Sequence, residues 1–188
     1  MSEDFKRALA EIQDGRTPEV FTFEADEEGR TLLHHSLTFN NQGAFLKLLE
    51  KAKTEAIALA DASGWTVLHQ AASLNSPSLI KSILETGAAV VDAQNSGGRT
   101  ALHYACSRGN VQAAVLLLNA GAKAHFQENL TGETPLHRAC ALGHIEVVRL
   151  MLQQSDAEEV SLIEDKQGRT AAQVALEEGH SEISKLFK

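Results

Sequence analysis

Five Gly-x-Thr triplets recur at nearly constant spacing along this chain of 188 residues. Their threonines are separated by 35, 34, 34 and 36 residues, and they are Thr31, Thr66, Thr100, Thr134 and Thr170. A histidine stands three residues after each of the first four threonines, and Gln173 takes that place in the fifth unit. A period of this length is typical of solenoids, in which no unit can bury its apolar face alone and neighbouring units supply the core.

Each unit reads as a helix, a turn and a second helix. Threonine is a favourable N-cap, and Pro135 follows Thr134 at the first helical position, where a missing N–H costs little. Gly87 and Gly121 end second helices in two units. Alanine and leucine provide 51 of the 188 residues, whereas aromatic residues are only 5%. This composition favours short, closely packed helices over a β-sandwich or barrel.

The two ends of the chain depart from the repeat. Residues 1–25 do not match it, and Asp4–Ile12 has apolar residues on one helical face, so we expect an N-terminal capping helix or a degenerate repeat. Residues 26–188 form the five predicted repeats. The last is expected to be a C-terminal cap, because it lacks the histidine and its second helix is short and half polar. We also expect 153–162 to be a polar loop.

Charge and composition exclude several classes of partner. Lysine and arginine total 17 against 25 acidic residues, so the net charge is −8, which argues against binding to nucleic acids and to anionic membranes. The longest apolar run has six residues, far fewer than the roughly 20 that span a bilayer. Two cysteines make no disulfide framework and fit a reducing compartment. We expect a monomer in the cytoplasm, with the nucleus as a second compartment.

The histidines and cysteines of the repeat have a catalytic or metal-binding alternative to their structural one. Stacked helices lie roughly 8–10 Å apart, while zinc ligands lie about 2 Å from the ion, so we expect the repeated histidines to form structural hydrogen bonds. Cys106 and Cys140 are predicted to be small core residues. The chain contains no phosphate-binding glycine loop and no hydrolase motif. We therefore expect no enzymatic activity, no metal and no cofactor.

Two segments carry a family resemblance. Residues 134–139 read Thr-Pro-Leu-His-Arg-Ala and residues 100–105 read Thr-Ala-Leu-His-Tyr-Ala, which resembles the Thr-Pro-Leu-His-x-Ala signature of the ankyrin repeat. The resemblance extends over five units in register. It implies an all-α solenoid of stacked helix-turn-helix units with hairpin loops that project from one side. It also implies a concave groove that binds another protein without catalysis.

Candidate contact residues stand between the framework positions of the repeat. In the ankyrin family the residue between Gly and Thr lies near the hairpin on the concave side, and the residue after His lies on the first helix. Packing against a neighbouring hairpin is the alternative for tryptophan, and a solvated charge is the alternative for the arginines. Exposed acids would attract a basic partner. The predicted partner-binding residues are Arg30, Trp65, Arg99, Tyr104, Arg138, Phe39, Glu27 and Glu28.

The order of the repeat variants gives a closer resemblance. A Gly-Trp-x-x-x-His unit at 64–69 precedes a Leu-His-Tyr-Ala unit at 102–105 and a Leu-His-Arg-Ala unit at 136–139. This order is similar to that of the gankyrin-type assembly chaperones of the proteasome regulatory particle. It implies as partner the C-terminal domain of a proteasomal ATPase subunit, with contacts at Arg30, Trp65, Tyr104 and Arg138. An ankyrin-type kinase inhibitor, a general adaptor, and an enzyme or ligand-binding protein are the alternatives.

Overall fold

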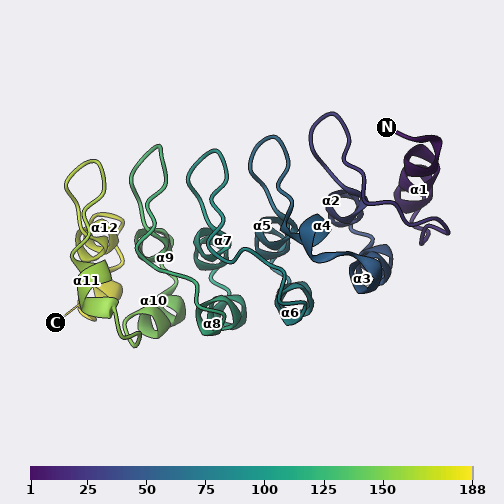
Figure 1. The fold of residues 1–188 in the computed structure, drawn as a ribbon. Helices are drawn as coiled ribbons and strands as arrows, with labels where there is room; N and C mark the ends of the chain where they lie inside the picture. Colours follow the sequence, from purple (N-terminus) through teal and green to yellow (C-terminus); the bar gives the residue numbers. More distant parts are fainter. Residues whose placement is uncertain (188) are drawn as a thin grey trace.

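The computed structural model describes residues 1–187; Lys188, the last residue of the predicted repeat region, lies outside them. The described residues form thirteen helices and no strand. The helices line up in two rows, and long hairpin loops project from one row (Figure 1). The predicted all-α solenoid of stacked helix-turn-helix units is confirmed.

Each repeat consists of a hairpin, an inner helix beside it and an outer helix in the second row (Figure 1). The inner helices are α2 (Leu32–Thr38), α5 (Val67–Ser73), α7 (Ala101–Ser107), α9 (Pro135–Ala141) and α12 (Ala171–Glu177). The outer helices are α3 (Gln42–Lys51), α6 (Pro77–Glu85), α8 (Val111–Asn119), α10 (Ile145–Met151) and α13 (Ser181–Ser184). The further helices are α1 (Glu3–Gln13), α4 (Thr54–Ala58) and α11 (Ala157–Ser161).

The repeated threonine begins every inner helix, as its residue type predicts. It is the N-cap of α2, α5, α7, α9 and α12, and in each case it forms a capping box with the side chain three residues later. In α9 the backbone N–H of Thr134 donates to Nδ1 of His137 over 3.3 Å. In α12 Gln173 takes the place of the histidine in the capping box, and its Oε1 accepts from the backbone N–H of Thr170 over 2.7 Å.

The repeated histidine also connects each repeat to the next. Because Nδ1 accepts from the threonine N–H, the proton of the neutral ring lies on Nε2, which donates to a backbone carbonyl in the following hairpin. Four such bonds span 2.9–3.3 Å, and their carbonyls belong to Trp65, Arg99, Glu133 and Arg169. The structural role predicted for these histidines is confirmed, and it includes a link between neighbouring repeats as well as the helix cap.

Small residues let the inner helices pack closely. Ala105 and Ala139 are fully buried, and so are Cys106 and Cys140. Burial raises the pKa of both thiols, that of Cys140 to about 12, so neither provides a thiolate near neutral pH. The prediction that the two cysteines are core residues is confirmed.

The N-terminal helix α1 packs against α2 at one end of the stack (Figure 1). Its apolar face is buried through Phe5, Ala8 and Ile12. The side-chain amide of Asn41, the N-cap of α3, donates to backbone carbonyls of Ile12 and Arg16, which ties the end of α1 to the first helix pair. The amphipathic helix expected at this position is therefore present.

The expected polar loop at 153–162 was wrong in part, since it contains helix α11. Val160 from this helix is 2% exposed in the core. A single buried residue among four polar or small ones gives no helical periodicity, so the sequence pattern does not reveal the helix.

Glycine at the hairpin corners is required by close backbone contact. Gly64 has φ +76°, and an added Cβ would lie 2.8 Å from the Cα of Asn95 in the next hairpin. Gly87 has φ +67° but has no heavy atom within 4 Å of such a Cβ.

Alanine at either Gly64 or Gly87 costs about 1–2 kcal/mol, because the backbone there is left-handed. We expect Gly64→Ala to lower the free energy of unfolding by about 1 kcal/mol more than Gly87→Ala does, because neighbouring backbone must move. Urea denaturation of the two variants measures this, and equal losses would contradict it.

Candidate protein-binding surface

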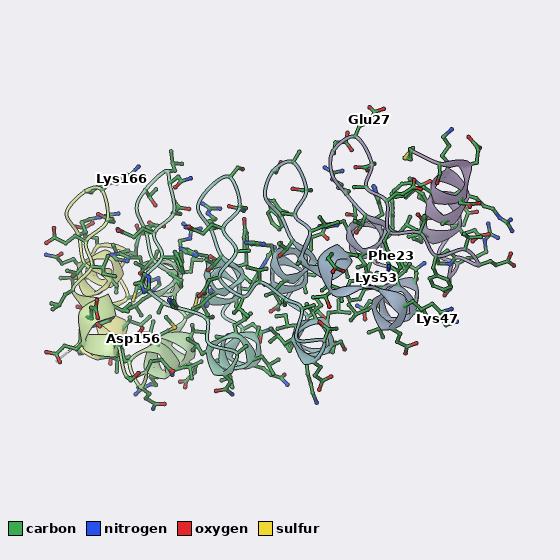
Figure 2. The ribbon with its side chains drawn as sticks, in the orientation of Figure 1. Phe23, Glu27, Lys47, Lys53, Asp156 and Lys166 are labelled. Carbon is green, nitrogen blue, oxygen red and sulfur yellow. The ribbon has the colours of Figure 1, made fainter. Side chains whose placement is uncertain are left out.

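The hairpins and the inner helices together form one continuous side of the molecule, here called the hairpin surface. Its hairpins are residues 26–30, 61–65, 95–99, 128–133 and 165–169. Each hairpin is joined to the next by one backbone hydrogen bond of 2.7–2.9 Å, from the first hairpin through to the fifth. Glu27 lies at the tip of the first hairpin and Lys166 at the tip of the fifth (Figure 2). The surface is thus a fixed series of loops that differ in charge from one end to the other.

Trp65 and Tyr104 come together on this surface. Their ring centroids lie 4.8 Å apart, and both rings also approach His69. The hydroxyl of Tyr104 accepts a hydrogen bond of 2.8 Å from the side-chain amide of Asn95. Both aromatic residues are half-buried. Trp65 thus packs against rings of the inner helices α5 and α7, whereas the alternative expected for it was packing along a neighbouring hairpin, and part of its surface remains open.

The predicted arginines differ in how closely their guanidinium groups are paired with carboxylates of this chain. Arg99 pairs with the buried carboxylate of Glu128, and Arg138 pairs with Glu133 over 2.9 Å. Although burial opposes it, hydrogen bonds from Thr131 and Arg99 lower the pKa of Glu128. These two arginines therefore hold neighbouring parts of the hairpin surface together.

Arg30 is less constrained than the other predicted arginines. Its guanidinium lies 3.7 Å from Asp61 and 3.9 Å from Glu28, and its side chain is 40% exposed. No hydrogen bond joins this guanidinium to any residue that the structure describes. Glu27 and Glu28 themselves are exposed at the first hairpin. Arg30 is thus the predicted arginine most available to a partner.

Exposed apolar side chains recur at one position of the repeat. Phe39, Leu74 and Leu142 are the C-cap residues of α2, α5 and α9, and they are 43%, 46% and 47% exposed. Leu74 lines a hollow together with Trp65. Phe39 was a predicted contact residue; its ring stacks on His35, with centroids 6.3 Å apart.

The sequence prediction missed Gln70, Asp61 and Leu130. Gln70 and Asp61 line a hollow beside Trp65. A signal for Gln70 was present, since it directly follows His69 at a candidate contact position, whereas the place of Asp61 depends on contacts between repeats that spacing does not reveal. Leu130 is 80% exposed at the tip of the fourth hairpin. A signal for it was present, since residues 128–132 contain one more residue than the corresponding 95–98 segment.

Each repeated histidine uses both ring nitrogens in the hydrogen bonds described above. Across residues 1–187, no three His, Cys, Asp or Glu side chains are placed to hold a metal ion. No helix in this range combines the length and the apolarity that crossing a membrane requires.

Comparison with known proteins identifies the repeats. A family model described as "Ankyrin repeats (3 copies)" matches residues 42–128 and 114–188. A segment of 72 residues is 33% identical to part of diacylglycerol kinase zeta from Rattus norvegicus, which corresponds to 38% of this chain and 8% of that protein. The chain therefore belongs to the ankyrin-repeat family, whose repeats mediate protein–protein interaction and are typically non-catalytic.

Proposed function

We propose that this chain is a non-catalytic scaffold that binds one protein partner along the hairpin surface. We further propose that the partner is the C-terminal domain of an ATPase subunit of the proteasome regulatory particle, so that the chain acts as an assembly chaperone like gankyrin. Such binding would shield the subunit from premature docking onto the core particle.

The observation that carries the proposal is the grouping of exposed contact residues on one surface. Trp65 and Tyr104 form an aromatic pair there, and Phe39, Leu74 and Leu142 expose apolar area at equivalent positions. Tryptophan, tyrosine and arginine dominate the binding energy of protein interfaces. The outer helices lack a comparable aromatic pair in the part of the chain that the structure describes.

The proteasomal partner is supported by the order of the repeat variants, from 64–69 through 102–105 to 136–139. These segments place Trp65, Tyr104 and Arg138 in three consecutive repeats. Trp65 contacts Tyr104, and Arg138 Nε lies 3.4 Å from the hydroxyl of Ser107 on the inner helix that carries Tyr104. The residues that the resemblance selects are therefore neighbours on one surface.

Affinity purification from the source cells tests the proposal, with wild-type chain, Trp65→Ala and Leu46→Ala as baits. Leu46 is an exposed leucine of the outer helix α3 and serves as the matched control. We expect a proteasomal ATPase subunit with the wild type and with Leu46→Ala. With its purified C-terminal domain, Trp65→Ala should weaken binding by more than about 1 kcal/mol.

Thermal unfolding of the three baits separates lost binding from lost folding. We expect Trp65→Ala to remain folded, because its partly exposed ring leaves the buried core around α5 intact. Recovery of a protein kinase without proteasomal subunits would replace the chaperone proposal by the kinase-regulator alternative. An unchanged Kd for Trp65→Ala would remove Trp65 from the binding site.

A further inference from the structure

Two adjoining hollows open on the hairpin surface between the first and the second repeat. Thr38, Trp65 and Gln70 line both of them, so we treat them as one feature, the Trp65 hollow. Their volumes are about 210 and 270 Å³. Pockets for small-molecule ligands are usually about 300–1,000 Å³, so each part of the Trp65 hollow suits a single side chain of a partner.

The polar atoms with unused bonding capacity in the hollow include two acceptors. Gln70 donates its amide N–H to the hydroxyl of Thr38 over 3.2 Å, which leaves its Oε1 buried without a hydrogen-bond partner in the described residues. Oδ1 of Asp61 accepts from the backbone N–H of Trp65 over 3.0 Å and from that of Ser63. Its Oδ2 lies 3.7 Å from the nearest guanidinium nitrogen, beyond hydrogen-bond distance.

The charge around the hollow is negative overall. Among the described residues, Glu28 and Asp61 share the single nearby cation Arg30, while Asp26 of the first hairpin is bonded to His35 over 2.7 Å. Unpaired buried acceptors are costly, so a side chain that brings donors is favoured. An excess of carboxylates further favours a donor that carries positive charge.

The indole ring of Trp65 lines the hollow and favours arginine over lysine. An aromatic face attracts cations, and tryptophan does so most strongly. The planar guanidinium of arginine stacks on such a ring and offers five N–H donors, whereas the lysine ammonium is a strongly hydrated point charge. A flat donor-rich cation therefore fits the aromatic wall and the two acceptors together.

We propose that the Trp65 hollow binds the guanidinium group of an arginine side chain on the protein partner. The guanidinium lies against the indole, donates to Oδ2 of Asp61 and, after a rotation of the Gln70 side chain toward the hollow, donates to its Oε1. Arg30 then pairs with Glu28, from which it is already only 3.9 Å away. This inference rests on the proposed function, because it describes how the same surface recognises its partner.

Trp65 is the single tryptophan of the chain, so its fluorescence reports on the hollow directly. The probes are N-acetyl-arginine amide, its uncharged analogue N-acetyl-citrulline amide and N-acetyl-glutamate amide. We expect a saturable change with the arginine probe and about fivefold weaker binding of the citrulline probe, in proportion to one lost charge interaction. No protein partner is used, so a failed search for proteasomal subunits leaves this result independent.

Asp61→Asn is the matched variant. Asn95 holds the equivalent place in the third hairpin and accepts from the backbone N–H groups of Gly97 and Arg99 over 3.0 Å each, so asparagine is compatible with the hairpin. We expect Asp61→Asn to weaken the arginine probe about fivefold, while Glu50→Gln, on the outer helix α3, leaves it unchanged. Equal binding of the arginine and citrulline probes, or no loss in Asp61→Asn, would overturn the proposal. Preferential binding of the glutamate probe would overturn it too, in favour of a carboxylate on Arg30.

Discussion

Lowering the pH from 7 to 5 is expected to destabilise the protein, by about 2 kcal/mol from His103 alone, because four buried histidines must stay neutral in the folded state. Burial lowers the pKa values of His34, His69, His103 and His137, that of His103 to about 4. The unfolded chain keeps a histidine pKa near 6.5. Protons therefore bind preferentially to the unfolded chain below this pH, and the free energy of unfolding falls as the pH falls.

The pH window follows from these values. When a histidine is protonated in the unfolded chain but neutral in the folded protein, it lowers the free energy of unfolding by about 1.4 kcal/mol for each pH unit of acidification. For His103 alone the interval from 6.5 to about 4 corresponds to about 3 kcal/mol. Some carboxylates have lowered pKa values, among them Asp26 and Asp165. They reduce the free energy of unfolding only when the pH falls below the ordinary pKa of an aspartate. The loss between pH 6.5 and 5 is thus assigned to the histidines.

Urea denaturation at pH 7.5, 6.5, 5.5 and 5.0 measures the effect, and His103→Gln is the control. Gln173 shows that glutamine can accept from the capping threonine N–H at this position. We expect His103→Gln to be less stable at neutral pH, because its link to the carbonyl of Glu133 is weakened. We also expect a slope shallower by about 1.4 kcal/mol per pH unit. A free energy of unfolding that is constant between pH 7 and 5 would contradict this account.

Leu102→Ala should produce the largest loss from a single core substitution in the middle of the stack. Leu102 is fully buried on α7, and this helix packs between α5 and α9. Removing its side chain leaves a cavity that rigid neighbours on both sides cannot fill, at a cost of about 2–5 kcal/mol. Leu130→Ala is the control: this leucine is 80% exposed, so its change should stay within about 0.5 kcal/mol.

Chemical denaturation of both variants at neutral pH measures the difference. The fifth repeat shows what alanine does at this position: Ala172 stands where Leu102 stands in the third repeat, and it lines an open hollow beside Leu152 and Phe187. Within residues 1–187, α12 has an inner helix, α9, on one side only (Figure 1), so alanine leaves no cavity between two inner helices there. Equal stability of the Leu102→Ala and Leu130→Ala variants would show that the third repeat is not packed as described.

The repeat framework could be predicted from the sequence because its signals are local. Thr134 and His137 are three residues apart, so cap, helix start and ring position follow from spacing alone. Helix α11 could not be predicted, since only Val160 reaches the core. The available charge on the surface could not be predicted either: Arg30 and Arg99 occupy the same register position, yet only Arg99 meets a buried glutamate from the following hairpin. Such contacts between repeats distinguish surface residues that spacing makes equivalent.

The histidine bonds between repeats give the stack a direction. Every interior unit contributes a backbone carbonyl to the unit before it and a ring N–H to the unit after it. Duplication of an interior unit therefore creates one new donor together with one new acceptor and leaves nothing unpaired. The fifth unit has Gln173 in place of histidine, so it lacks the ring N–H that the four preceding units donate to the next hairpin. An array of this kind can lengthen or shorten during evolution by whole interior modules.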